Sequence, residues 1–386
     1  MPTDMTATQP IPILDLSRQY AAIGDEIQSA IAAVCSAGRF ILGREVTELE
    51  TEVARMCGAG FGVGCASGTD ALWLALASLG IGEGHAVITT PFSFFATASS
   101  ILRSGARPVF ADIDPISFNL SPASVQEALT ANPDTRAIMP VHLYGQCADW
   151  DAFTTLATQH DLRLVEDAAQ AFGATWRGTP AGALGDAAAF SFYPTKNLSA
   201  WGDAGMITTS SPTAADTARS LRAHGMRRRY YHDEVGWNSR LDTVQAAVLL
   251  VKLRYIAQWN EDRRCAAARY DSVFAAMNLV GAVADGGIAL PASDPRGTHV
   301  WHQYVVRTPQ RDSLRAHLTA HGIGSEVYYP LPLHMQDALR DLGYREGQFP
   351  ESERAAREVL ALPIYPELRE DEQVRVVEAI HSFFRA

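Results

Sequence analysis

The sequence predicts an α/β protein with a large, mostly parallel β-sheet, followed by a smaller C-terminal α+β domain. Up to about residue 210, short apolar runs alternate with amphipathic helical patterns. Several runs are apolar on both faces, which is typical of parallel strands covered by helices on each side. A long helical pattern over residues 240–278 then replaces the alternation. We therefore expect a large domain over residues 1–250 and a small domain over residues 251–386.

Seven segments have the composition of strands. In chain order they are residues 61–66, 86–90, 107–113, 136–143, 163–168, 187–193 and 205–210. The last two are joined with little helix between them, which predicts one antiparallel hairpin within the sheet.

Helical periodicity is found before the first strand and between most of the later ones. The predicted helices cover residues 20–38, 45–58, 69–80, 121–133 and 150–161, and a single long helix is expected over residues 240–278.

Composition narrows the class of function. The formal net charge of -11 disfavours a broad nucleic-acid surface, because phosphate neutralisation needs clustered basic residues. The five cysteines are odd in number and never spaced as C-x-x-C, which favours reduced thiols over disulfides or a zinc site. The N-terminus lacks the pattern of a signal peptide, and no apolar run is long enough to span a membrane. We expect a cytoplasmic protein with no membrane or nucleic-acid partner.

The chain has 30 arginines but only two lysines, Lys196 and Lys252. A guanidinium cannot be deprotonated in a protein, so a lysine retained among arginines suggests a need for its amine. Lys196 lies in SFYPTKN, directly after a predicted strand. Lys252 lies on the long amphipathic helix, where we expect a solvated or snorkelling cation and no site.

The segment CASGTDAL at residues 65–72 follows a strand and opens a helix. Gly68 permits a tight turn, and the amides near Thr69 and Asp70 suit a phosphate group. A capped helix with no ligand, with Thr69 or Asp70 as its N-cap, is the alternative. The overlapping GVGCASG lacks the spacing and the later acidic residue of a dinucleotide-binding loop, which disfavours nicotinamide or flavin.

Glu166 and Asp167 end a buried strand, where ligands gather in open α/β sheets. A carboxylate buried there needs a cation or a donor, and a protonated heterocycle nitrogen would serve, although helix capping by Asp167 is an alternative. Together with Lys196 and the phosphate-binding helix start, Asp167 supplies the parts that pyridoxal phosphate needs. The lysine would form the Schiff base and shuttle the proton, after burial lowers its pKa from about 10.4.

Motifs along nearly the whole chain resemble those of the DegT/StrS family of sugar aminotransferases. They include GRFILGREV, ASGTDAL, TTPFSFFATA, PVHLYGQCADWD, EDAAQAFGA, GDAAAFSFYPTKN, NSRLDTVQAA and YYPLPLH. The resemblance implies a vitamin B6 enzyme with the aspartate aminotransferase fold, which is fold type I.

Carried over by position, the resemblance makes Lys196 the lysine that carries pyridoxal 5'-phosphate and Asp167 the partner of its ring nitrogen. It makes Gln170 the ring-hydroxyl contact, and Phe94 a stacking ring where the residue alone would suggest a core aromatic. It assigns phosphate contacts to Gly68, Thr69 and Ser191, a phosphate contact from a neighbouring subunit to Asn238, and substrate contacts to Arg228, Tyr230 and Arg240.

The implied reaction moves an amino group from L-glutamate to a keto group of a nucleotide-linked sugar within a homodimer. Gln170 and HLYGQCAD are more similar to members that aminate C3 than to those that aminate C4. The basic run HGMRRRYYH suits a nucleotide diphosphate or is a solvated loop. Three alternatives remain: a C4-keto sugar as acceptor, a cyclitol ketone such as an inosose as acceptor, and a non-catalytic regulatory relative.

The sequence departs from the family pattern at four positions. Ser199 and Ala204 stand where many members have glycine, Arg44 replaces a frequent proline, and Phe172 replaces a histidine.

Overall fold

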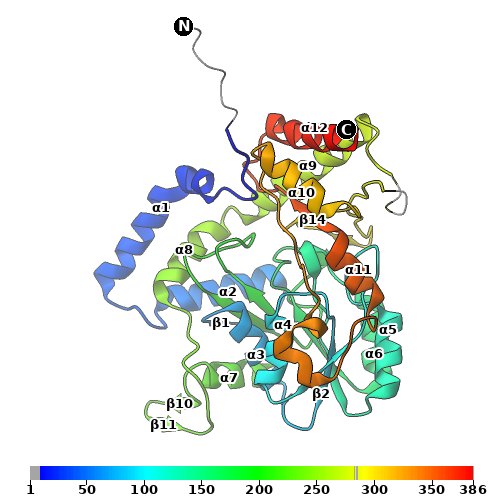
Figure 1. Cartoon of the computed structure of the whole chain (residues 1–386). Coiled ribbons are helices and arrows are strands. Elements are labelled where there is room, and N and C mark those ends of the chain that lie inside the picture. Colours follow the sequence, from blue (N-terminus) through cyan, green and yellow to red (C-terminus); the bar gives the residue numbers. More distant parts are fainter. Residues whose placement is uncertain (1–8, 282, 284–285, 386) are drawn as a thin grey trace.

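The computed structural model describes residues 9–281, 283 and 286–385 (Figure 1). At its centre is a seven-stranded sheet, and all seven predicted strands are confirmed. Their spatial order is β1 (Phe61–Cys65), β9 (Gly205–Thr209), β8 (Ala187–Ser191), β5 (Arg163–Asp167), β4 (Thr135–Ile138), β2 (Ala86–Thr89) and β3 (Arg107–Phe110).

The sheet is parallel except at β9, which pairs antiparallel with both β8 and β1. The predicted hairpin of β8 and β9 is therefore confirmed. Because β1 and β8 flank the same antiparallel strand, they run in one direction together with β5. The carboxyl ends of β1, β5 and β8 consequently meet at one edge of the sheet.

Five of the predicted helices are confirmed. They are α1 (Leu16–Ala37), α2 (Arg44–Cys57), α3 (Gly68–Ser78), α5 (Pro122–Ala131) and α6 (Trp150–His160). The single long helix was wrong, since α8 (Thr243–Leu253) and α9 (Ile256–Ala276) are separate. Neither proline nor glycine stands at the break, so the sequence carried no local signal for it.

Within residues 1–250, two helices were not predicted, α4 (Ala96–Arg103) and α7 (Pro212–Leu221). Helix α4 has only eight residues, too few for a recognisable sequence pattern, and its first turn has no side-chain cap as a start signal. It matters because it lies beside the carboxyl end of β5.

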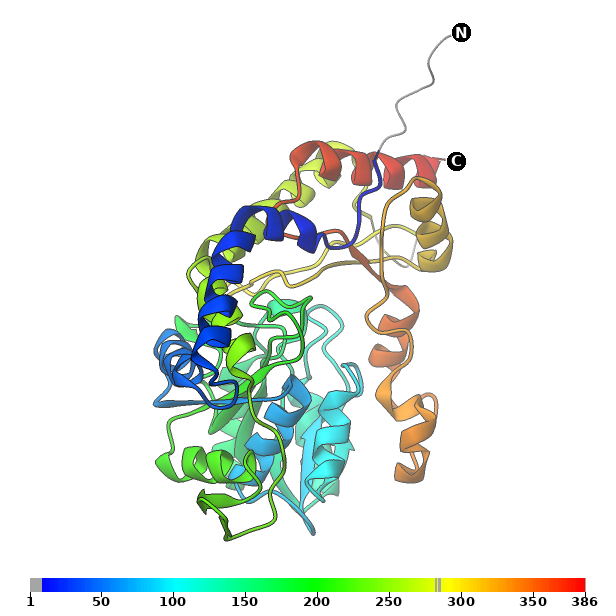
Figure 2. The same cartoon turned by 90° about the vertical axis from the view of Figure 1, so that its left-hand side faces the viewer.

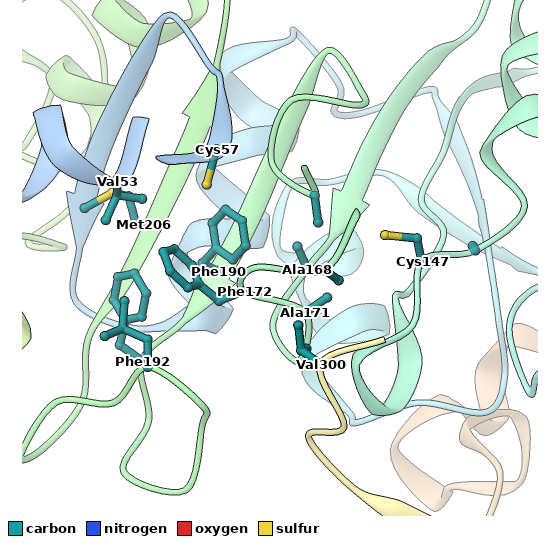
Figure 3. Packing of buried hydrophobic residues seen from close by; sticks show 14 of the residues in the cluster. Val53, Cys57, Cys147, Ala168, Ala171, Phe172, Phe190, Phe192, Met206 and Val300 are labelled. Atoms are coloured by element: carbon teal, nitrogen blue, oxygen red, sulfur yellow. The ribbon is translucent and has the colours of Figure 1, made fainter. Parts of the chain in front are cut away.

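Apolar clusters cover both faces of the sheet, because successive strand residues point to opposite sides. Ala189 belongs to the cluster around α3, and Phe190 belongs to the cluster on the other face. In the latter cluster Phe172, Phe190 and Phe192 lie together (Figure 3). The ring centroid of Phe172 is 5.3 Å from that of Phe190 and 6.2 Å from that of Phe192. Phe172, one of the departures from the family pattern, therefore packs in the core.

A separate apolar cluster lies in the C-terminal part, above the sheet in Figure 1. Its elements are α9, β13 (Tyr304–Arg307), α10 (Arg311–Ala320), β14 (Val359–Leu362) and α12 (Glu370–Arg385). Smaller elements are η1 (Leu143–Gly145), β6 (Thr175–Trp176), β7 (Thr179–Pro180), β10 (Met226–Arg228), β11 (Tyr231–His232) and β12 (Gly297–Thr298).

Two segments cross the division predicted at residue 250, which itself stays a prediction. Near the N-terminus, the Ile11 amide donates to the Gly322 carbonyl at 2.9 Å, and Ile11 packs in the C-terminal cluster. In the other direction, a segment with η3 (Leu333–Met335), η4 (Asp337–Leu342) and α11 (Pro350–Glu358) runs down along the sheet domain (Figure 2). Within the described residues, no helix combines the length and hydropathy needed to cross a membrane.

Candidate active site

A cavity of about 790 Å³ opens at the carboxyl edge of the sheet, between the sheet domain and the C-terminal part. Seven of the predicted site residues line it together. They are Gly68, Thr69, Phe94, Asp167, Gln170, Ser191 and Lys196. Strand ends β5 and β8 and the start of α3 therefore deliver these side chains to one space, as the parallel topology requires.

Asp167 ends β5 and is buried. Its carboxylate accepts a hydrogen bond from Thr97 Oγ1 at 2.8 Å and one from the Ala169 amide at 3.3 Å. Ser93 Oγ lies 2.8 Å from Thr97 Oγ1, and since Thr97 donates to Asp167, Ser93 is the donor. Burial raises the pKa of Asp167, and these donors and the Lys196 charge oppose the rise. The carboxylate is thus oriented to meet a further donor from the cavity.

Glu166 has a different role from its neighbour. Its carboxylate accepts from the amides of Gly182, Leu184 and Gly185 at 2.8 to 3.0 Å and contacts His142 Nε2 at 3.1 Å. These bonds hold the chain between β5 and β8. Glu166 does not line the cavity, and Asp167 alone of the pair is a candidate for ligand binding.

Lys196 sits in the turn that follows β8. Its amide donates to the Tyr193 carbonyl at 2.8 Å, and its side chain lines the cavity. Burial lowers the pKa of Lys196 to about 8, while the Asp167 carboxylate opposes this shift. Near neutral pH a useful fraction of the amine is therefore unprotonated and nucleophilic.

The start of α3 corrects a detail of the sequence analysis. Ser67 is the N-cap, since its Oγ accepts from the Asp70 amide at 3.1 Å, so the proposed capping by Thr69 or Asp70 was wrong. The amides of Gly68 and Thr69 lack intrahelical partners and border the cavity. A Cβ on Gly68 would stand 2.5 Å from the Ser191 Cβ, so only glycine allows this close approach. The place suits a phosphate group.

Both the oxygen and the nitrogen of the Gln170 side-chain amide form hydrogen bonds. Its Oε1 accepts from the Tyr144 amide at 2.7 Å, and its Nε2 donates to the Tyr329 hydroxyl at 3.1 Å. Because an amide nitrogen has two hydrogens, one donor is left for a ligand. The Phe94 ring is 59% exposed at the cavity, with its centroid 6.3 Å from that of Tyr329.

Four predicted residues do not line the cavity of their own chain. Asn238 is exposed, and its Oδ1 accepts from Arg240 Nη2 at 2.7 Å. Arg228 and Tyr230 belong to the β10–β11 hairpin, which projects from the body at the lower left of Figure 1. The Arg228 guanidinium lies 3.5 Å from the Tyr231 ring centroid, and Tyr230 is 76% exposed.

Sequence reasoning missed several residues that line the cavity, among them Thr97, Arg263, His302 and Tyr329. Thr97 and Tyr329 were inside quoted motifs, but nothing marked either as a contact. His302 Nδ1 lies 3.1 Å from Asn197 Oδ1, and both Asn197 Nδ2 bonds go to other acceptors. His302 therefore donates from Nδ1, and burial keeps its pKa well below the usual value.

The sequence prediction for Lys252 was wrong. This lysine is 2% exposed, and its Nζ donates to Ser199 Oγ at 3.0 Å. Its helix, α8, is packed between α1, α2 and the loop that carries Lys196, and an amphipathic pattern could not reveal that its polar stripe is also covered.

The cavity fits pyridoxal 5'-phosphate. The free amides at Gly68 and Thr69 suit its phosphate, the buried Asp167 suits a protonated ring nitrogen, and Lys196 offers an amine of lowered pKa for its aldehyde.

A sequence model described as the DegT/DnrJ/EryC1/StrS aminotransferase family matches residues 21–381. A pleiotropic regulatory protein of Geobacillus stearothermophilus is 50% identical, with 97% of this chain and 99% of that protein covered. A dTDP-3-amino-3,4,6-trideoxy-alpha-D-glucose transaminase of Streptomyces venezuelae is 43% identical, with 97% of each covered. A crystal structure of S. venezuelae DesV in complex with a ketimine intermediate has a TM-score of 0.93 at 43% identity, covering 98% of this chain and 100% of that one.

Capture of pyridoxal 5'-phosphate by the cofactor-free protein should follow the neutral amine of Lys196. Since its pKa is about 8, the capture rate should rise about tenfold per pH unit below pH 7 and level off above about pH 9. Stopped-flow absorbance measures this rate, with Lys196→Ala as the silent control. A rise that continues to pH 10 would show an amine of ordinary pKa.

Asp167→Asn should weaken binding of pyridoxal 5'-phosphate by at least about tenfold, because the charge that meets the ring nitrogen is lost while the shape is kept. Thr97→Val removes one hydroxyl donor to that carboxylate, so it should cost less, about fivefold. Equilibrium titration by absorbance gives both affinities. An unchanged affinity in Asp167→Asn would mean that another residue meets the nitrogen.

Proposed function

Because the chain belongs to the DegT/DnrJ/EryC1/StrS aminotransferase family, we propose that it moves the amino group of L-glutamate to the C3 keto group of a nucleotide-linked deoxysugar. It is a sugar aminotransferase that depends on pyridoxal 5'-phosphate. The observation that carries the proposal is the meeting of the Lys196 amine, the Asp167 carboxylate and the α3 start in one cavity. A chain that had lost the chemistry would have no reason to keep this set.

Pyridoxal 5'-phosphate supplies an electron sink and carries the amino group between the two substrates. Lys196 would take the proton from the donor Cα and return a proton to the acceptor carbon. Its pKa of about 8 suits both directions of transfer near neutral pH. Asp167 would keep positive charge at the ring nitrogen, and Thr97 keeps Asp167 in place.

The remaining residues of the cavity would bind and orient. Gly68, Thr69 and Ser191 would hold the phosphate, Phe94 would lie against the ring, and Gln170 would contact its hydroxyl. Apolar lining residues exclude water from the reacting atoms, notably Ile13, Leu14, Leu362 and Ile364.

Support for C3 comes from two sources. Gln170 stands in the motif that resembles the C3-aminating members, and it lines the cavity. In addition, the S. venezuelae relative is named as the transaminase of a 3-amino sugar. A C4-keto sugar or an inosose is the alternative acceptor.

A regulatory role without catalysis is a second candidate function, since the relative at 50% identity is named a pleiotropic regulatory protein. The position of Lys196 favours catalysis, because its amine lines the same cavity as the Asp167 carboxylate and the start of α3.

We further propose a homodimer with shared active sites. Large apolar side chains stay exposed on the chain, a pattern expected of an interface. They include Leu16, Tyr20, Phe40, Ile41, Leu42, Phe94 and Trp201. In this assembly Asn238 would reach the cofactor phosphate in the partner's site, and Arg228, Tyr230 and Arg240 would contact the substrate there.

We also propose a cytoplasmic location, since all five cysteines are free thiols.

The substrate can be tested with purified protein, L-glutamate and a panel of dTDP- and UDP-linked 3-keto and 4-keto sugars, with an inosose included. We expect 3-keto sugars to be aminated at least about tenfold faster than the others, because orientation at the reacting carbon decides the rate. Lys196→Arg keeps the charge but should abolish turnover. Faster amination of a 4-keto sugar or an inosose would correct the acceptor, and no turnover with any compound would favour the regulatory role.

Mixed dimers test the shared site. Lys196→Ala and Asn238→Ala homodimers should each be impaired at both sites, whereas a mixed dimer combines both lesions in one site and leaves the other intact. Re-paired variants should therefore recover about half of the wild-type activity per mixed dimer. If Asn238 serves its own chain, activity will stay at the average of the two parents once subunit exchange has been verified.

A further inference from the structure

Lys252 is a buried cation whose hydrogen bond goes to a neutral hydroxyl. Its Nζ donates to Ser199 Oγ at 3.0 Å, and both residues are almost fully buried. Burial lowers the pKa of Lys252 to about 8, with the Glu367 carboxylate opposing the shift. Burying an ammonium is costly unless it is paired and hydrogen-bonded.

The hydroxyl that Lys252 holds belongs to the loop of the first lysine. The Ala200 amide donates to the Phe192 carbonyl at 2.7 Å, which closes a loop over residues 192–200. Lys196 lies inside this loop, three residues before Ser199. The chain has 30 arginines and only two lysines. One of these lysines lies in this loop, and the other donates a hydrogen bond to it.

Other contacts fix the loop on its remaining sides. Asn197 Nδ2 donates to Asn260 Oδ1 at 2.9 Å and to the Val300 carbonyl at 3.0 Å. The Trp201 amide donates to Gln245 Oε1 at 2.9 Å. Gln245 and Lys252 are seven residues apart on α8, so they share one helix face, and that face is the rear wall of the loop.

Arginine would not replace Lys252. Its planar guanidinium is larger and brings five donors, whereas the buried space offers the single Ser199 hydroxyl as acceptor. The buried arginines differ in this respect, since Arg222, Arg263 and Arg311 each donate to at least two acceptors.

We propose that Lys252 is a positioning residue for amino transfer, which fixes the loop of Lys196 by donating to Ser199. The inference rests on the proposed role of Lys196.

The test uses Lys252→Met, Ser199→Ala and the double variant as holoenzymes. The single-turnover rate with L-glutamate should fall about tenfold in each single variant, while the glutamate concentration at half-maximal rate changes less than about twofold. The double variant should be no slower than the slower single variant, because both changes remove the same bond. Arg254→Met is the matched control, since Arg254 is an exposed cation on the turn after α8 that pairs with Glu26, and its rate should be unchanged.

A second readout needs no cofactor. With only two lysines, cofactor-free protein labelled with 13C at lysine Cε gives two assignable signals. Ser199→Ala keeps both lysines and should move the Lys196 signal. Rates within twofold of wild type and an unmoved Lys196 signal would overturn the proposal, even if the melting temperature falls. Should Lys252→Met fail to fold, Ser199→Ala alone decides by the same two criteria. If wild type does not react with glutamate, the proposed function fails, and the signal still tests the positioning.

Discussion

Burial of an acid and an amine in one cavity is the constraint on which the rest of this structure depends. Asp167 and Lys196 both lose solvation there, so burial raises the pKa of the acid and lowers that of the amine, while each charge favours the other. The parallel sheet makes this possible, since β5 and β8 are neighbours and end at the same edge. A ligand with a cationic nitrogen would offset the cost of burying the Asp167 carboxylate, and its aldehyde would react with the neutral amine of Lys196.

The layer behind these two side chains holds them at fixed positions. Ser93 donates to Thr97, which donates to Asp167, so a helix of eight residues orients the carboxylate. Behind Lys196, the loop is anchored to α9 through Asn197 and to α8 through Ser199. Reacting groups positioned this way keep their geometry through the two half-reactions, which is what transfer between different substrates demands.

The strands, most helices and the central residues of the site could be predicted because they rest on local signals. Apolar runs show the strands, and a solitary lysine and a strand-end carboxylate show the chemistry. What failed depended on tertiary contacts. Lys252 was expected in solvent because a helical pattern does not reveal what covers its polar stripe. Thr97 was missed because its helix is short and has no side-chain cap. Asn238 and Arg228 lie outside the cavity of their own chain, and their roles stay predictions.

The most direct measurement is the titration of the Lys196 amine in cofactor-free protein, read from its 13C signal in wild type and in Asp167→Asn. The account predicts a wild-type midpoint near pH 8. Because the Asp167 charge raises the pKa of Lys196, the midpoint should move lower still when that charge is removed. A wild-type midpoint near the ordinary lysine value, or one that Asp167→Asn leaves unchanged, would contradict the coupling of the two buried groups.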